Sequence, residues 1–456
     1  MGGAGPKGQI GPDRELPENR LRLSVVTSPE LLPAHGCCNS CVASVARSVL
    51  WQPCGFIYCL FSLPELMTIP LAAAIDRRTT WLMTIACLLS IGSLYYNQPL
   101  LVLMSQTYQV SVVQVSAVPT LTQMGYALGM LLFIPLGDRV NRRKLIVGLS
   151  GLNAIALLLI AYSPSFTWLV SLSFVNGMTA IVPQLLVPFA AQLAHPAQRG
   201  RVVGTVMGGL LAGIVVGRLA GGIVGSIWGW RAIFAVAALG MVLLAGLLYK
   251  TLPSIAPSVQ LAYGALMRSL PTLLTTYPLL RETALMGGLF FSVYCGFWAT
   301  LPFLLAQPPF ALGSQVAGAF GLVGIVGVIA APVVGRIADR RSPRVTVWAA
   351  IGFLLVALVV LWGAQHWLLG IWAGAILLDL AVQTGQISNQ TRIYTLPVTA
   401  HNRITTVYMV SYFLGGSLGS WLCAYAWKLA GWAGVCTFGL AIAAIAGAVF
   451  WVRRAR

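Results

Sequence analysis

The feature that most constrains this chain is a series of long apolar runs that repeat from about residue 80 to the end. Each run has about 20 residues or more, enough for a helix to cross a hydrocarbon layer ~30 Å thick. Helices and closed barrels are the only structures that satisfy every backbone polar group in lipid, and continuous runs of this length indicate helices. The composition agrees, because 58% of the 456 residues are hydrophobic and 8% are charged. We therefore expect an all-α membrane protein with many crossings.

The apolar runs predict twelve transmembrane helices in two sets of six. The spans lie near residues 80–104, 112–137, 145–163, 166–194, 201–226, 230–249, 284–307, 312–338, 345–364, 366–392, 404–428 and 432–452. Between the sixth and seventh spans lies the longest internal connection, which contains four prolines. We therefore expect a six-helix half at 80–249, a cytoplasmic central linker at 250–283 and a second six-helix half at 284–456.

The net charge of +18 is carried by loops on one side of the predicted bundle. When twelve spans are threaded through a membrane, basic residues after spans two, four, six, eight and ten and at the C-terminus share one side. Arg231 and Lys428 fall on the other side. This asymmetry is typical of cytoplasmic loops. It places both ends of the twelve-helix body in the cytoplasm and gives no indication of nucleic-acid binding.

Residues 1–79 form an N-terminal extension that the twelve-span pattern leaves out. The run 49–75 is apolar, but three prolines and Glu65 interrupt it, and a thirteenth span would invert the charge pattern. Segment 35–41 holds one histidine and three cysteines in a single cluster, whereas a structural zinc site needs four ligands at workable spacing. We expect no metal, and an extension that is either disordered or not translated, with Met67 as the alternative start.

Two loops at matching places in the halves carry the same motif. "IPLGDRVNRRKLI" (134–146) follows span two, and "GRIADRRSPRVTV" (335–347) follows span eight. A paired loop at half-chain spacing indicates an internal repeat, which many transporters contain. Together with "LYYNQPLL" (94–101), "GWRAIF" (229–234) and "YFLGGSLGS" (412–420), these loops resemble the major facilitator superfamily, in particular its bacterial drug:proton antiporter-like branch.

This resemblance covers about residues 75 to 452 and implies two pseudo-symmetric six-helix halves in the bacterial plasma (inner) membrane. It also implies that the two loops lock the halves together on the cytoplasmic face and release them during transport. The alternative is that the loops only set the topology. The candidate gating residues are Asp138, Arg139, Arg142 and Arg143 in the first loop and Gly335, Asp339, Arg340 and Arg344 in the second.

The stretch "ILLDLAVQTGQISNQ" in span ten places a carboxylate within an apolar span. Of the ten acidic residues, Asp379 alone is expected inside the membrane, and Arg218 in span five is the basic residue expected at a similar depth. A charge at the bilayer centre costs roughly 2.5–3.5 kcal/mol on insertion scales, so it faces a cavity or a partner. Asp379, Gln383, Gln386 and Gln390 recur at i, i+4, i+7 and i+11 and so share one helical face.

In the family that the chain resembles, spans one, four, seven and ten line a central cavity, so this polar face is predicted to meet the substrate. The alternative is a structural hydrogen-bond network. We predict that Asp379 takes up and releases a proton, because burial favours the neutral carboxyl group and a nearby guanidinium favours the charged one. Arg218, from the opposite half, is predicted to approach it in at least one state. Further cavity candidates are Tyr95, Tyr96, Asn97, Gln98, Asn176, Gln184, Tyr294 and Trp298.

Span five carries a glycine at every fourth position, which makes one smooth stripe. The stripe consists of Gly209, Gly213, Gly217, Gly221 and Gly225. Small residues at this spacing let two helices approach closely. The resemblance places span five at the contact between the halves, so the stripe is predicted to be either a static packing face or a surface on which the halves slide.

These features favour a secondary transporter that works by alternating access and exports small amphipathic compounds in a proton-coupled manner. They do not favour an enzyme, because the four histidines are scattered at loops or span ends and no G-x-x-x-x-G-K loop for ATP is present. We expect no cofactor and no nucleic acid; the expected partners are a small-molecule substrate, protons and the lipid bilayer, and the chain is expected to be a monomer. Two alternatives stay open: proton-coupled uptake of a small metabolite, and a transport-inactive membrane receptor or scaffold.

Overall fold

The computed structural model describes residues 2, 75–137, 139–254, 263–340, 342–397 and 401–452, with the side chains at 265, 266, 331, 337–340 and 401 left out. The chain divides into two units, Met1–Thr68 and Ile69–Arg456. The helices described below belong to the second unit. The N-terminal extension up to residue 74, with Met67, lies outside the described residues, as do Asp138 and the side chains of Asp339 and Arg340.

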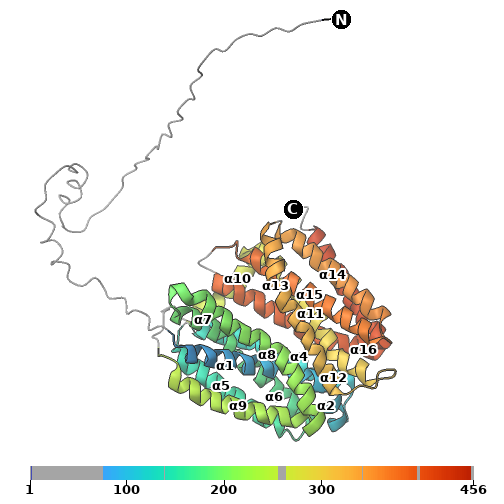
Figure 1. Ribbon diagram of the computed structural model, residues 1–456, viewed down its shortest axis with the longest axis horizontal. Helices are drawn as coiled ribbons and strands as arrows, with labels where there is room; N and C mark the ends of the chain where they lie inside the picture. The colour runs from blue at the N-terminus through green and yellow to red at the C-terminus, as the bar shows by residue number, and fades with distance from the viewer. Residues whose placement is uncertain are drawn as a thin grey trace, which may run out of the picture. The chain divides into compact units, whose positions relative to one another are not determined.

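The N-terminal half, blue to yellow-green in Figure 1, is a run of helices with short turns between them. Its elements are α1 (Arg77–Tyr95), η1 (Gln98–Leu100), α2 (Leu101–Tyr108), α3 (Val112–Val115), α4 (Ala117–Gly137), α5 (Arg142–Ala161), α6 (Phe166–Thr179), α7 (Val182–Leu193), η2 (Pro196–Gln198), α8 (Arg199–Trp228) and α9 (Trp230–Thr251). Helix α10 (Tyr263–Thr276) follows within the connection to the second half.

The C-terminal half, yellow to red in Figure 1, repeats this helical pattern. Its elements are α11 (Pro278–Ala306), α12 (Ser314–Ala319), η3 (Phe320–Leu322), α13 (Val323–Arg340), α14 (Pro343–Gly363), α15 (Leu368–Ile393) and α16 (His401–Val452). The seventh span therefore begins at Pro278 and not near residue 284. A proline is favourable at the first position of a helix, where its missing N–H is no loss.

Within the described residues, eleven helical segments are long and apolar enough to cross a membrane. The last, Asn402–Val452, has 51 residues, or about 75 Å of helix, more than twice what one crossing needs. It breaks at Ala430 and Gly431, where Gly431 has φ +58°, in the left-handed region that favours glycine. Helix α16 thus supplies two crossings. The predicted fold class, an all-α bundle of twelve transmembrane helices in two halves, is confirmed.

Four predicted spans are interrupted. Span one divides into α1 and α2, span two into α3 and α4, span four into α6 and α7, and span eight into α12 and α13. The break before α7 has a local cause, because Pro183 at its second position cannot donate a backbone hydrogen bond to the preceding turn.

The glycine stripe of α8 packs against the first helix of its own half. A Cβ added to Gly217 would lie 2.8 Å from the Gly92 carbonyl oxygen, and one added to Gly221 would lie 2.8 Å from that of Tyr96. The expectation of a sliding surface between the halves is therefore wrong for this stripe. The structure places all five of its glycines against α1 or η1: Gly209, Gly213, Gly217, Gly221 and Gly225.

The same packing recurs in the second half, where glycines of α16 contact α11. A Cβ on Gly415 would lie 2.5 Å from Gly288 Cα. Helices α8 and α16 hold equivalent places as the fifth span of each half, and α1 and α11 as the first. The two halves therefore repeat one close helix contact, as expected for an internal repeat.

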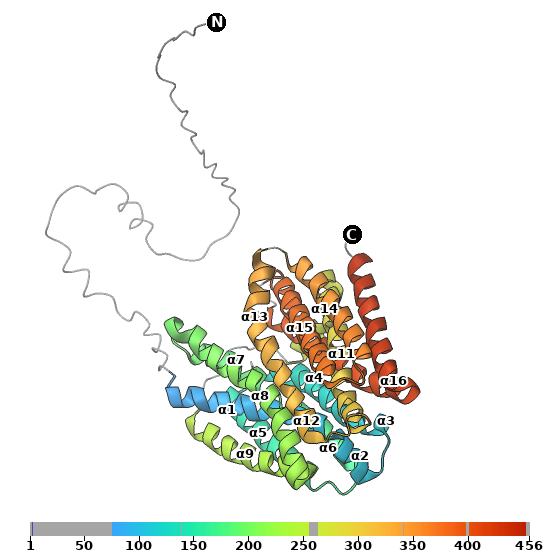
Figure 2. The ribbon, with the colours of Figure 1, turned by 45° about the vertical axis from the view of Figure 1, so that its right-hand side comes forward.

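The halves meet chiefly where α4 packs against α16 and α8 against α12. The rings of Tyr126 and Phe413 lie 4.5 Å apart, and Ser417 Oγ donates a hydrogen bond to the Thr120 carbonyl at 2.9 Å. Figure 2 shows α2, α3 and α12 at one end of the bundle, while α7 and α13 diverge towards the other. We call the first end the closed end. The opposite end, where α4 leads into the Arg139–Lys144 loop, is called the basic end.

Candidate functional site

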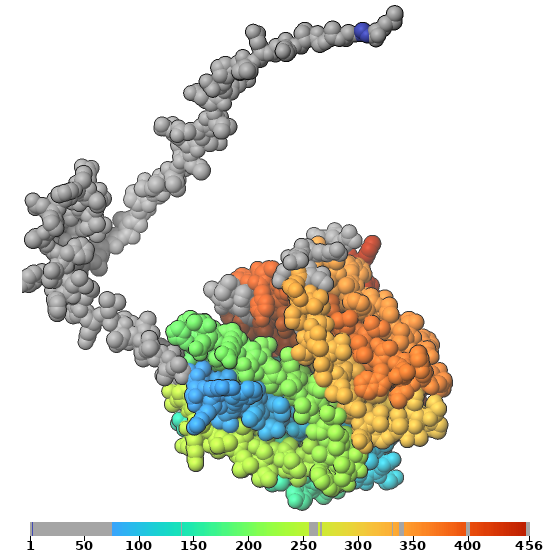
Figure 3. Space-filling view, viewed as in Figure 1, coloured from blue at the N-terminus to red at the C-terminus, as the bar shows by residue number. Residues whose placement is uncertain are grey.

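A cavity of about 390 Å³ lies between the two halves, whose meeting line is visible in Figure 3. Helices α1, α4, α7 and α8 contribute one side of it, and α11, α13, α15 and α16 contribute the other. Its lining is mainly apolar and aromatic, with four glutamines and one carboxylate. The aromatic and polar members are Tyr95, Tyr126, Gln184, Phe291, Tyr294, Asp379, Gln383, Gln386, Gln390, Tyr412 and Phe413.

The cavity extends towards the basic end of the bundle. On α15 the lining residues run from Asp379 to Gln390, close to the end of that helix. On α7 they include Gln184 and Pro188, and on α8 they begin at Met207, within the first third of the helix. All three stretches lead towards the same end. The cavity therefore continues on the basic side of Asp379.

At the closed end the halves are in backbone contact. A Cβ added to Gly318 of α12 would lie 2.6 Å from the Arg218 carbonyl oxygen and 2.9 Å from Gly222 Cα. Ser314 Oγ also donates a hydrogen bond to the Gly222 carbonyl at 3.3 Å. Only residues without a side chain permit this approach. The halves thus touch at the closed end and enclose a cavity that extends towards the basic end.

Arg218 is fully buried between the cavity and the closed end. Its Nε donates to Gln98 Oε1 at 2.7 Å, and its Nη2 donates to the Tyr294 hydroxyl at 3.2 Å. Its guanidinium carbon also lies 3.9 Å from the ring centre of Trp298 and 4.6 Å from that of Tyr95. Aromatic faces stabilise a desolvated cation, which accounts for a charge held at this depth. Among the described residues, Nη1 has no hydrogen-bond partner.

Asp379 is 3% exposed and lies on the cavity side of this cluster. The Tyr294 hydroxyl and the Gly327 backbone interact with its carboxylate, and the Arg218 charge acts on it through space. A Cβ added to Gly327 would collide with Asp379 Oδ2, so the carboxylate occupies the space that this glycine leaves. Among the described residues, no direct ion pair joins Arg218 to Asp379; Tyr294 lies between them.

The polar stripe of α15 lines the cavity on the basic side of Asp379. Gln383, Gln386 and Gln390 are all lining residues. The Tyr412 hydroxyl donates to Gln386 Oε1 at 3.3 Å, which ties the stripe to α16. Facing it from the N-terminal half, Gln184 Nε2 donates to the Tyr126 hydroxyl at 3.2 Å.

Five of the predicted cavity residues are not among those that line it. Asn97 donates to Thr122 Oγ1 at 3.2 Å, and Asn176 donates to the Ser93 carbonyl at 3.2 Å, both inside the N-terminal half. Tyr96 packs edge-on against Phe234 within that half. These three residues hold helices together. The other two, Gln98 and Trp298, contact Arg218 outside the cavity.

The basic residues of the first loop contact their own half. Arg142 donates to the Gly137 carbonyl at 3.0 Å and to Gln192 Oε1 at 2.8 Å. Arg143 donates to the Tyr249 carbonyl and lies 4.7 Å from the centre of that ring. Arg139 is exposed. These contacts hold the loop to α7 and α9, and the gating role predicted for it stays a prediction.

In the second loop, Gly335 has open space around its Cα, and the Arg344 backbone N–H donates to Ser342 Oγ at the start of α14. Asp138 and the side chains of Asp339 and Arg340 fall outside what the structure describes.

A buried ion pair escaped the sequence analysis. Glu282, within the predicted linker, and Arg392, at the predicted end of span ten, lie inside α11 and α15 with their charged atoms 2.5 Å apart. Both residues are buried, and Arg392 also lies 5.4 Å from the Phe450 ring centre. Asp379 is therefore not the sole acid buried in a helix. The signal was present in "PLLRETALM", since a proline four residues before Glu282 is a typical helix start.

Two six-helix halves that enclose a cavity with a buried carboxylate at their junction form the architecture of a membrane transporter. Residues 80–420 match the model of the Major Facilitator Superfamily. The chain belongs to this family. It is 40% identical over 370 residues to the uncharacterized transporter YgaY of Escherichia coli, covering 81% of this chain and 94% of that one. It is 31% identical over 349 residues to a probable transporter of Streptomyces coelicolor, covering 76% and 80%.

Solved structures show the same fold. A bacterial homolog of the human lysosomal transporter Spinster, in an inward-facing and unoccupied conformation, aligns with a TM-score of 0.65 and 16% identity over 85% of this chain and 97% of that one. The nucleoside transporter NupG aligns with a TM-score of 0.67 and 13% identity over 82% and 99%. At this identity the likeness concerns the fold alone. The protein is thus a multi-pass membrane transporter of bacterial type, and its place in the drug:proton antiporter-like branch stays a prediction.

Proposed function

We propose that this protein is a proton-coupled secondary transporter that exports small amphipathic compounds by alternating access. The observation that carries the proposal is the placement of Asp379. Its carboxylate lines the cavity from the C-terminal half and is connected through Tyr294 to Arg218 of the N-terminal half. A titratable group at the junction of two moving bodies can couple its proton to their movement.

The electrostatics of this cluster supply the coupling. While Arg218 and Tyr294 are close, they favour the charged carboxylate. If the halves part at the closed end, Arg218 moves away with α8, and a buried, unpaired carboxylate becomes costly. Asp379 then binds a proton. Return of Arg218 releases the proton to the side on which the cavity is open, so one proton crosses for each cycle.

The lining of the cavity supports the proposed substrate class. Stacked aromatic rings, such as Phe291 and Tyr412 with centroids 4.0 Å apart, offer a broad apolar wall. Three glutamines of α15 offer hydrogen bonds on one strip of that wall. A cavity of about 390 Å³ fits a small organic molecule with one polar edge.

Orientation follows from the basic loops. If they lie in the cytoplasm of a bacterium, as positive loops do in inner-membrane proteins, the hollow end faces the cytoplasm and both ends of the helical body lie there. The conformation described here is then inward-facing. The cavity is formed by helices of one chain, which supports a monomer as the working unit. The gating role of Asp138 and Asp339 is part of the same proposal.

Transport by inverted membrane vesicles tests this function. Vesicles with and without the protein would receive a panel of amphipathic compounds and small metabolites, with and without an imposed proton gradient. The proposal predicts gradient-dependent accumulation of at least one amphipathic compound, abolished by a protonophore. Accumulation in right-side-out vesicles alone would support uptake, and binding without gradient-dependent accumulation would support a receptor or scaffold.

A further inference from the structure

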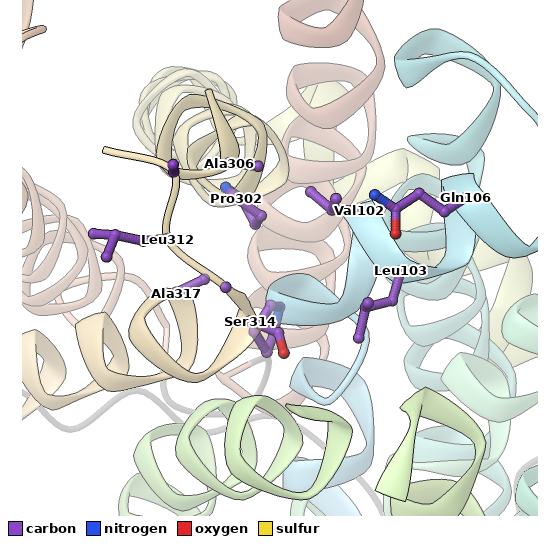
Figure 4. A pocket seen from close by; sticks show the side chains of 11 residues that line it. Val102, Leu103, Gln106, Pro302, Ala306, Leu312, Ser314 and Ala317 are labelled. Atoms are coloured by element: carbon purple, nitrogen blue, oxygen red, sulfur yellow. The ribbon is translucent and has the colours of Figure 1, made fainter. Parts of the chain in front are cut away.

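A second pocket lies at the closed end, on the far side of Arg218 from the cavity. It has a volume of about 240 Å³ and is lined by both halves. Figure 4 shows Val102 and Leu103 of α2 facing Pro302 of α11, with Ser314 and Ala317 of α12 completing the wall. The pocket and the cavity thus lie on one line through the bundle, with the Arg218 cluster between them.

The residues that separate the two spaces come from both halves. Gln98 and Arg218 belong to the N-terminal half, and Tyr294 and Trp298 to the C-terminal half. We call these four the Arg218 layer. Tyr294 lines the cavity. On the other face, Gln98 precedes the pocket residue Pro99, and Trp298 lies one helical turn before the pocket residue Pro302. The layer therefore forms the wall between the two spaces.

The contacts that hold the Arg218 layer together across the halves can break together when the halves separate. Arg218 keeps Gln98 as a partner inside its own half, at 2.7 Å. The contacts of its side chain with the other half include a 3.2 Å hydrogen bond to Tyr294 and a ring contact with Trp298. Separation of the halves at this end would break the second set and leave the first intact. Nη1, which has no hydrogen-bond partner in the part of the chain that the structure describes, is available for water or substrate at that moment.

We propose that the Arg218 layer is the gate at the closed end and that the pocket beyond it is the collapsed vestibule through which the substrate passes. The proposal rests on transport by alternating access. Gly222 and Gly318 set how far the gate closes, because their backbones touch one turn beyond Arg218. A methyl group at either position would hold α8 and α12 apart, so that the gate could not close fully.

Labelling of Val382→Cys tests this gate. Val382 is 3% exposed and lines the cavity, so a membrane-impermeant maleimide applied at the closed end reaches it only when the layer opens. The parent chain supplies the background, since Cys436 and the other described cysteines are buried. In the otherwise unchanged protein we expect slow labelling above that background. No labelling would overturn the proposal.

Two second-site changes sharpen the test. Gly222→Ala should raise the rate of labelling about 10-fold or more, the scale of effect that one overpacked methyl group produces. The matched control is Gly208→Ala on the same helix, where an added Cβ meets nothing within 4 Å. Trp298→Phe, which keeps an aromatic ring, should raise labelling less. An unchanged rate in both Gly222→Ala and Trp298→Phe would also overturn the gate.

The outcome is separable from that of proton coupling, because labelling needs neither substrate nor a gradient. If labelling responds while transport proves independent of protons, the gate stands and the proposed coupling fails. If transport is proton-coupled but labelling does not respond, the gate fails alone.

Discussion

Arg218, Tyr294 and Asp379 bring two opposite charges and a hydroxyl group together at a place with little water. A buried charge left without partners is costly, and here each charge has partners that leave one atom unsatisfied, Arg218 Nη1 and Asp379 Oδ2. A cluster whose hydrogen bonds are nearly all made in one conformation can be rearranged by binding a proton or a substrate. The amide pair of Asn153 and Asn176, by contrast, lies within one half and binds helices α5 and α6 together.

Tyr294→Phe isolates the role of the hydroxyl group. The substitution keeps the ring against Phe291, at 5.7 Å between centroids, and removes the hydrogen bond from Arg218. A hydrogen bond to a charged group contributes about 1.5–3 kcal/mol, so gradient-driven transport should fall about 10-fold or more while substrate exchange without a gradient changes little. Tyr425→Phe, at an exposed position of α16, is the control. Equal losses in driven transport and exchange would show that the hydroxyl only maintains the fold.

Gly327→Ala tests the fit of the carboxylate against α13. The added Cβ would collide with Asp379 Oδ2 and lie 2.9 Å from Gln383 Cγ. Overpacking of this kind costs about 1–3 kcal/mol, so the variant should unfold at lower temperature in detergent and bind substrate more weakly. Gly352→Ala, which meets nothing within 4 Å, should do neither. A Gly327→Ala protein with wild-type binding and stability would mean that the Asp379 side chain can adopt another conformation at no cost.

At the scale of helices, the sequence predicts best what depends on periodicity and length. The face of α15 that carries Asp379, Gln383, Gln386 and Gln390 follows from the helical repeat, and the structure places all four in the cavity. Partners across the halves could not be predicted in this way. That Trp298 lies 3.9 Å from Arg218 depends on how two helices far apart in the sequence pack together. Helix ends were also uncertain, which is why the Glu282–Arg392 pair was missed.

The Glu282–Arg392 pair fixes the ends of α11 and α15 at the basic end. The two side chains are about nine-tenths buried and 2.5 Å apart, and removal of one partner from a buried pair costs about 3–5 kcal/mol. Glu282→Gln should therefore lower the midpoint of thermal unfolding, whereas Arg281→Gln, at the exposed neighbouring position, should not. The double variant Glu282→Gln with Arg392→Gln should recover much of the loss. A double variant less stable than either single one would contradict this pairing.

For the whole molecule, the conformation is set by a balance between the two ends. The closed end gains from the Arg218 layer and from the contact of Gly222 with Gly318. The basic end holds a cavity with largely apolar walls. A transporter needs these two arrangements to differ by only a few kcal/mol, so that a proton and a substrate together can reverse the preference.

The most direct test of proton coupling is Asp379→Asn in reconstituted vesicles. The amide has nearly the shape of the carboxylate but cannot take up a proton at physiological pH. Gradient-driven accumulation of substrate should be abolished, while exchange of labelled for unlabelled substrate without a gradient continues near the wild-type rate. Asp76→Asn, at the exposed residue before α1, should leave both unchanged. If Asp379→Asn still accumulates substrate against a gradient at the wild-type rate, the carboxylate is structural and the proton binds elsewhere.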